Sequence, residues 1–209
     1  SLYYIRAVRF GSPWAPMLLW DLTRKEDYFP LLKKHVNADE PAALFTWAEL
    51  GMNGFDHQLT ESQSIDFLKQ SAANDFPEAL VALAMYLYNG SKVLKDQEKA
   101  IELLNLARQL GNHEAKIRLY MIELMTEKQI PGDSSRFKSI QELADNGSIL
   151  ADMLLGYCYR NGKDVAVNLP EAVRLYRKAT RRGSNIAYDA LRNMYDEIRP
   201  KDLEFQIQE

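Results

Sequence analysis

The chain has 209 residues, of which 46% are apolar and 26% are charged, and its formal net charge is −3. This is the composition of a folded protein, and its slightly acidic balance excludes the basic footprint of a protein that binds nucleic acid or an acidic membrane. One cysteine excludes an intrachain disulfide, and no apolar run approaches the ~20 residues that span a bilayer, so we expect no membrane insertion.

Alanines spaced 36 positions apart mark an internal repeat along the chain. A glycine stands eleven positions after three of the anchor alanines, and a glycine or an aspartate suited to a left-handed turn stands four positions before an anchor. Seventeen positions after the anchor stands a helix N-cap residue, as in Thr60, Asp96 and Asn168, and Gln63 and Glu171 complete two capping boxes. The pattern therefore predicts that each repeat forms a helix A, a loop, a capped helix B and a turn. The anchors are Ala43, Ala79, Ala115, Ala151 and Ala187, and Ala15 begins a shorter repeat.

In chain order, the sequence predicts a single repeat domain over 1–209 that opens in the middle of a repeat. The partial repeat covers 1–14, with the end of a helix B at 2–11. Repeats follow at 15–42, 43–78, 79–114, 115–150 and 151–186, and a final helix and cap cover 187–209. Expected helices include 15–23, 26–36, 62–74, 97–110 and 186–198, the last of which ends before Pro200.

The repeat anchored on Ala115 departs from the others. Arg136 stands in the slot that holds Ala100 and Ala172, and burying an arginine in a tight contact between helices is costly. We therefore expect this repeat to have a longer loop and a shifted helix B, capped by Asp133 or Ser134.

The residues from Ala151 to Gly183 carry a recognisable pattern. Leu155, Gly156, Tyr159 and Gly162 follow the anchor at characteristic spacings, and a weaker copy begins at Ala79. This pattern resembles the Sel1-like repeat, a relative of the tetratricopeptide repeat, although Lys92 and Asp164 replace the second loop glycine. The resemblance implies an all-α fold, an α/α solenoid forming a right-handed superhelix with a concave groove.

Chemistry-bearing residues are sparse. The three histidines are scattered without ligand spacing, no glycine-rich phosphate loop is present, and we expect neither a metal, a cofactor nor catalytic residues. Ser135 and Lys138 fit S-x-x-K without its partner motifs, which leaves a β-lactam-interacting hydrolase as a remote alternative. Cys158 is expected to be a buried, inert thiol. The cations Arg177, Lys178, Arg181 and Arg182 fit either a solvated helix end or a patch for an acidic partner.

By resemblance to tetratricopeptide solenoids, helix A lines the concave surface at anchor positions −1, +2, +6, +9 and +10. Six of the seven methionines fall in these slots, and methionine is over-used on surfaces that adapt to a partner. Tight winding would instead pack these residues against neighbouring helices. The predicted partner-binding groove comprises Met17, Phe45, Met52, Val81, Met85, Tyr88, Ile117, Met121, Leu124, Met125, Met153, Tyr157 and Arg160.

The sequence therefore predicts a non-catalytic adaptor or regulator that binds a protein or peptide partner through its concave surface. The resemblance also implies an immunity-type inhibitor of a secreted toxin as an alternative, and it favours a periplasmic or envelope-associated location. A further alternative is a structural segment that self-assembles. We expect instead that the protein is a monomer or a weak homo-oligomer. The chain begins at Ser1, so its N-terminus gives no evidence about an export signal.

Overall fold

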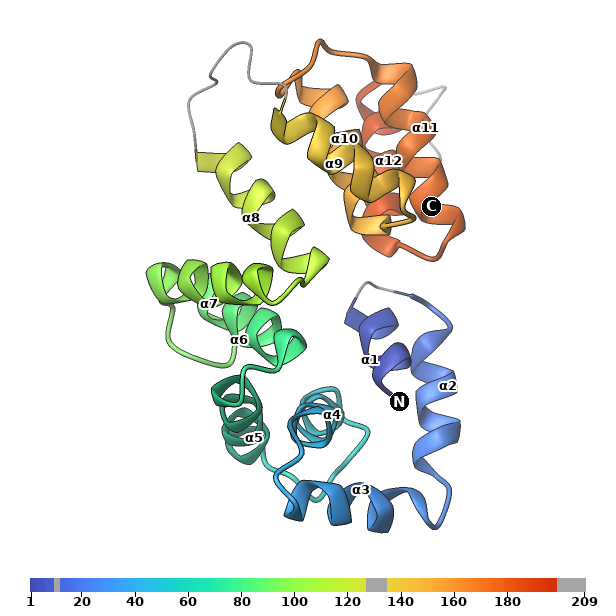
Figure 1. Ribbon diagram of the computed structural model, residues 1–209. Helices are drawn as coiled ribbons and strands as arrows, with labels where there is room; N and C mark the ends of the chain where they lie inside the picture. The colour runs from blue at the N-terminus through green and yellow to red at the C-terminus, as the bar shows by residue number, and fades with distance from the viewer. Residues whose placement is uncertain (10–11, 127–134, 199–209) are drawn as a thin grey trace. The chain divides into compact units, whose positions relative to one another are not determined.

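The computed structural model describes residues 1–9, 12–126 and 135–198, which form twelve helices (Figure 1). The chain divides into two compact units, residues 1–10 with 14–128 and residues 11–13 with 129–209. The first unit contains α1 (Leu2–Arg9), α2 (Ala15–Thr23), α3 (Tyr28–Asn37), α4 (Pro41–Met52), α5 (Glu61–Ala73), α6 (Pro77–Asn89), α7 (Gln97–Gln109) and α8 (His113–Thr126). The second contains α9 (Ser135–Asp145), α10 (Ile149–Asn161), α11 (Leu169–Arg181) and α12 (Asn185–Ile198).

The predicted helix pairs are confirmed. Within the units α4 packs on α5, α6 on α7, and α10 on both α9 and α11. The anchor alanines and the small residues that face them are buried; Ala79, Ala100, Ala151 and Ala172 have no exposed surface. Their missing bulk lets the two helices of a pair approach closely, and stacked pairs then bury the faces that one pair would leave exposed.

Of the two predicted capping boxes, the one at Thr60 is confirmed and the one at Asn168 is only half formed. The Thr60 side chain accepts a hydrogen bond from the Gln63 N–H, and the Gln63 side chain completes the capping box. Asn168 accepts from the Glu171 N–H, although both carboxylate oxygens of Glu171 bond Arg174. The turns before the anchors are left-handed, at φ 54° in Asp75 and 88° in Gly147.

In the repeat anchored on Ala115, the prediction that helix B is shifted out of register is wrong. Helix α9 begins at Ser135, later in its repeat than the other helices B, yet it keeps their register. Ile140 is buried at the position of Leu68 and Leu104. Arg136 therefore stays in the small slot, where its guanidinium bonds Asp164 at 2.7 and 2.9 Å. The expected caps Asp133 and Ser134, the helix end at 10–11 and the tail 199–209 lie outside the described residues.

A helical glycine in α10 fixes how closely α11 approaches it. A Cβ built on Gly156 would lie 2.8 Å from Tyr176 Cε1 and 3.0 Å from two further atoms of the same ring. We expect Gly156→Ala to lower the free energy of unfolding by about 1–2 kcal/mol, because overpacking outweighs the gain in helix propensity. Urea denaturation measures this difference.

The matched control is Gly156→Ala in a Tyr176→Leu background. There the ring is absent and the alanine should be neutral or stabilising, because only its helix propensity remains. An equal cost of Gly156→Ala in both backgrounds would show that the ring is not the cause.

Candidate functional site

The first helix lies on the helices A of the first unit. Helix α1 packs against α2 and α4 (Figure 1), and Ile5 is only 1% exposed within the core that also contains Phe45 and Val81. Two arginines follow Ile5 at one and four positions along α1. Helical geometry sets Arg9 on the same face of α1 as Ile5, whereas Arg6 is rotated by about 100° from it.

Both arginines of α1 reach carboxylates on later helices of the same unit. Arg6 forms an ion pair with Glu78 of α6. Arg9 Nη2 donates to Glu114 Oε1 of α8 at 3.2 Å, and Arg118 Nε donates to the same oxygen at 2.7 Å. The side chains of Arg9 and Glu114 are each only 12% exposed, so this pair is largely withdrawn from water.

A third carboxylate, Glu49 of α4, belongs to the same cluster. Glu49 is 1% exposed, and its Oε1 has no hydrogen-bond partner among the described residues; the same is true of Arg9 Nη1. Burial raises the pKa of Glu49 above its ordinary value, against the opposing effects of Arg9 and Asn53. Burial acts in the same direction on Glu114, but Arg9 and Arg118 together outweigh it, and the pKa of Glu114 is lowered.

We call Glu49, Glu78 and Glu114 the acidic face. Glu49 occupies anchor position +6, and Glu78 and Glu114 occupy position −1, which are slots of the predicted groove. The sequence prediction missed these residues because it selected apolar side chains in those slots. The available signal was a carboxylate recurring at the same slot in two consecutive repeats.

The residues predicted for the groove divide by burial. Phe45, Val81, Ile117 and Leu124 are at most 3% exposed, which corrects their assignment to a partner surface: they are core residues. Met17 and Met125 are 54% and 61% exposed. Half-buried positions are held by Met52, Met85, Tyr88, Met121, Met153, Tyr157 and Arg160. Met153, Tyr157 and Arg160 lie in the second unit, and the other ten predicted residues lie in the first.

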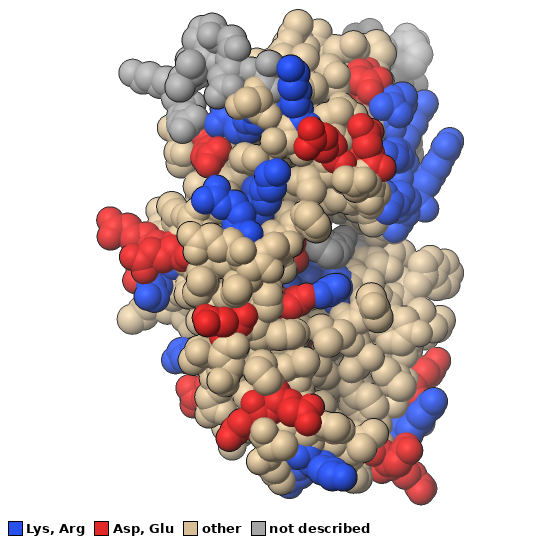
Figure 2. All heavy atoms as spheres, in the orientation of Figure 1, with Lys and Arg blue, Asp and Glu red and all other residues tan. Residues whose placement is uncertain are grey.

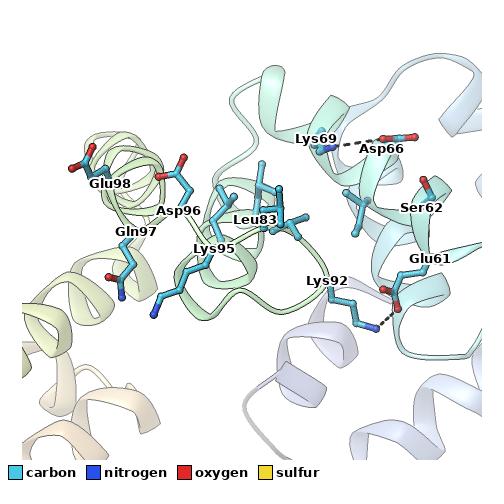
Figure 3. Close-up of a pocket in the computed structure, with 14 residues that line it drawn as sticks. Glu61, Ser62, Asp66, Lys69, Leu83, Lys92, Lys95, Asp96, Gln97 and Glu98 are labelled. Atoms are coloured by element: carbon cyan, nitrogen blue, oxygen red, sulfur yellow. Dashed lines mark hydrogen bonds and ion pairs between the residues drawn. The ribbon is translucent and has the colours of Figure 1, made fainter.

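An outer hollow of about 1200 Å³ lies between α5 and α7 (Figure 3). Leu83 and Leu87 line it together with charged side chains, and Lys92 bonds Glu61 across its edge. Three lysines and four carboxylates line it, so it favours neither sign of charge.

Catalytic chemistry has little support in the described part of the chain. Ser135 and Lys138 are both exposed at the start of α9, whereas an activated serine needs a positioned base in a water-excluding site. Cys158 is fully buried, and burial raises its thiol pKa to about 12, which keeps it protonated and unreactive. Within the described residues, no three histidine, cysteine or acidic side chains are grouped to hold a metal. No described helix is long and apolar enough to cross a membrane.

Repeated helix pairs with small residues at their contacts define the class of α/α repeat proteins. Within this class, the sequence profile of the Sel1 repeat matches residues 77–112 and 149–184, which cover α6 with α7 and α10 with α11. These two segments of the chain are therefore Sel1 repeats. Such repeats typically mediate protein interactions and are generally non-catalytic.

Sequence relatives match about half of the chain. The protein named DAP3-binding cell death enhancer 1 from Rattus norvegicus is 31% identical over 107 residues, which are 51% of this chain and 21% of the relative. Its counterpart from Mus musculus matches with the same identity and coverage. The chain therefore spans about a fifth of the length of the curated relatives it matches.

Two solved structures share the fold at low sequence identity. A protective antigen of uropathogenic Escherichia coli strains, c5321, which displays an SLR fold, matches 80% of this chain and 36% of its own at 20% identity and a TM-score of 0.58. A Sel1 repeat protein from Oxalobacter formigenes matches 89% and 70% at 18% identity and a TM-score of 0.57. These likenesses establish the fold of the chain.

Proposed function

We propose that this protein is a non-catalytic adaptor or regulator that binds a helical segment of a protein partner on the acidic face. One observation carries the proposal: α1, a short helix with two arginines and a buried isoleucine, already occupies that face. A helix laid across other helices with an apolar anchor and flanking charges is a recurring mode of peptide recognition.

The chemistry of α1 specifies the partner. Two of the three carboxylates are paired by α1, whereas Glu49 keeps a buried oxygen without a hydrogen bond from the described residues. A buried, unsatisfied polar group is costly, so a helix that also brings a donor to Glu49 gains over α1. We therefore expect a basic, amphipathic partner helix that displaces α1. The exposed Met17 and Met125 of the same unit offer further adaptable contact area.

The name of the rat relative describes it as binding another protein, which agrees with an interaction role. The identity of the partner of this chain is best sought by capture with the full-length protein in its own cell, followed by the competition test below.

A peptide of residues 1–10, labelled with fluorescein, tests the site. Charge reversal of Arg6→Glu with Arg9→Glu in the full chain should expel α1, because each new carboxylate then faces an acidic partner. This variant should bind the peptide at least about tenfold more tightly than the wild-type chain, whose face is occupied. Fluorescence anisotropy gives both dissociation constants.

The control is the same peptide with both arginines replaced by glutamate, which should bind neither chain. Circular dichroism verifies that the variant stays helical. Equal binding of the two chains, or binding of the acidic control peptide, would rule out the acidic face as the site.

A further inference from the structure

A second charged surface lies in the other unit, on the outward side of α11. Ala172, Leu175, Tyr176 and Ala179 face the core, and the opposite side presents five cations. These are Arg174, Arg177, Lys178, Arg181 and Arg182, and we call them the basic ridge. Figure 2 shows this gathering of blue side chains over α11.

A buried carboxylate of α10 positions two of the cations of the basic ridge. Asp152 of α10 has no exposed surface, and it accepts from Lys178 Nζ at 2.7 Å and from Arg182 Nη1 at 3.4 Å. Arg182 Nη2 also donates to the Gly147 carbonyl oxygen at 2.6 Å. Because Asp152 is buried, it orients these cations without offering a carboxylate to the surface.

Two further members of the ridge, Arg174 and Arg177, are also positioned by neighbouring side chains. Arg177 Nη2 bonds the Tyr195 hydroxyl, and its guanidinium lies 5.9 Å from the centre of that ring. Arg174 pairs with Glu171 one turn earlier. Arg181 completes the row and is exposed. Donors that are already oriented lose less entropy when a ligand arrives.

The ridge encloses a shallow hollow of about 560 Å³ in which Pro170 and Val173 provide apolar surface between the cations. We infer that this ridge is a docking surface for an acidic, partly apolar segment of a protein partner, separate from the acidic face of the first unit.

Charge and size favour this occupant over other polyanions. The ridge extends from Arg174 to Arg182, about 12 Å along one helix, which suits a few carboxylates better than a long phosphate backbone. The net charge of the whole chain is −3, so a long polyanion that continues beyond the ridge meets repulsion. Apolar side chains between the carboxylates would fill the hollow at Val173, which a bare phosphate backbone has no groups to do.

The test measures anisotropy of a fluorescein-labelled peptide of alternating glutamate and leucine with the full chain. Arg177→Glu with Arg181→Glu should weaken binding at least about tenfold, because the ridge then repels carboxylates. This pair spares Lys178 and Arg182, which bond Asp152. The matched control, Lys33→Glu with Lys34→Glu on the exposed side of α3, changes the net charge equally and should alter binding less than about twofold.

Three results would overturn the inference: no binding by the wild-type chain, equal weakening by both double variants, or tighter binding of oligothymidylate or of vesicles containing phosphatidylserine than of the peptide. The probe is acidic and the ridge lies in the second unit, so this outcome is independent of the basic-peptide test of the acidic face.

Discussion

Replacing Glu114 by glutamine is expected to lower the free energy of unfolding by about 2–4 kcal/mol, whereas the same replacement at Glu49 is expected to raise it by about 1 kcal/mol. Both carboxylates are buried in the cluster beneath α1, yet their surroundings act in opposite directions. Glu114 bonds Arg9 and Arg118, so removing its charge leaves two guanidinium groups with less compensation. Glu49 has a buried oxygen without a described partner, so a neutral amide relieves the cost of burying a charge.

The pKa directions give a second readout. The lowered pKa of Glu114 means that its contribution to stability is complete above the ordinary value of 4.5 and is lost as the pH falls through the folded-state value below it. The raised pKa of Glu49 means that ionisation destabilises the fold at neutral pH, and that this cost disappears as the pH falls through the raised value towards 4.5.

Urea denaturation of the wild type between neutral pH and about pH 4.5 should therefore show a gain in stability on acidification, which Glu49→Gln abolishes. Glu114→Gln should instead retain this gain and show a smaller fall in stability at lower pH, where the lowered pKa of Glu171 also contributes to the fall. Equal and same-sign effects of the two replacements would contradict the opposite pKa shifts and with them the placement of Arg9 beside Glu114.

The sequence predicted the features that recur among the helix pairs, and it missed the contacts that occur only once. Ala79, Gly90 and Asp96 recur at fixed offsets because each helix pair must solve the same local problem of close approach, chain reversal and capping. The docking of α1 had no such signal, since Arg9 and Glu114 are separated by 105 positions and their pairing occurs once. A periodic pattern also cannot tell a groove wall from a core, and Phe45 and Ile117, in groove slots, are buried.

The prediction of a single domain stays a prediction, and so does a partner groove formed by the predicted residues that are not buried in the core. The acidic face and the basic ridge, by contrast, depend on a few charged side chains whose partners lie on other helices. Tertiary packing determines such contacts, so the sequence pattern alone does not predict the charge of a partner.

Arg136 and Asp164 should behave as one unit in a double-mutant cycle. Arg136 stands where two other repeats hold alanine, and Asp164, at φ 59°, stands where the family pattern has its second loop glycine. Each departure is unfavourable by itself: an arginine enters a crowded slot, and a residue with a Cβ takes a left-handed backbone. Together they form a two-bond ion pair whose side chains are 14% and 4% exposed.

We therefore expect Arg136→Ala to destabilise the protein by about 2–4 kcal/mol, because Asp164 then stays buried without its guanidinium. Asp164→Gly should cost less, because glycine relieves the left-handed strain while the arginine loses its carboxylate. The double variant restores the family pattern and should lie within about 1 kcal/mol of the wild type, a coupling of about 2–3 kcal/mol. Urea denaturation of the four proteins measures each corner of the cycle.

The first unit supplies the control for this cycle. Lys92, at φ 70°, occupies the same loop position and pairs with Glu61 of the preceding helix B, but these side chains are 32% and 55% exposed. Water screens this pair, so the cycle of Lys92→Gly with Glu61→Ala should give a coupling below about 0.5 kcal/mol. If both cycles gave the same small coupling, Arg136 and Asp164 would be independent substitutions, and burial would not explain why this repeat keeps an arginine between its helices.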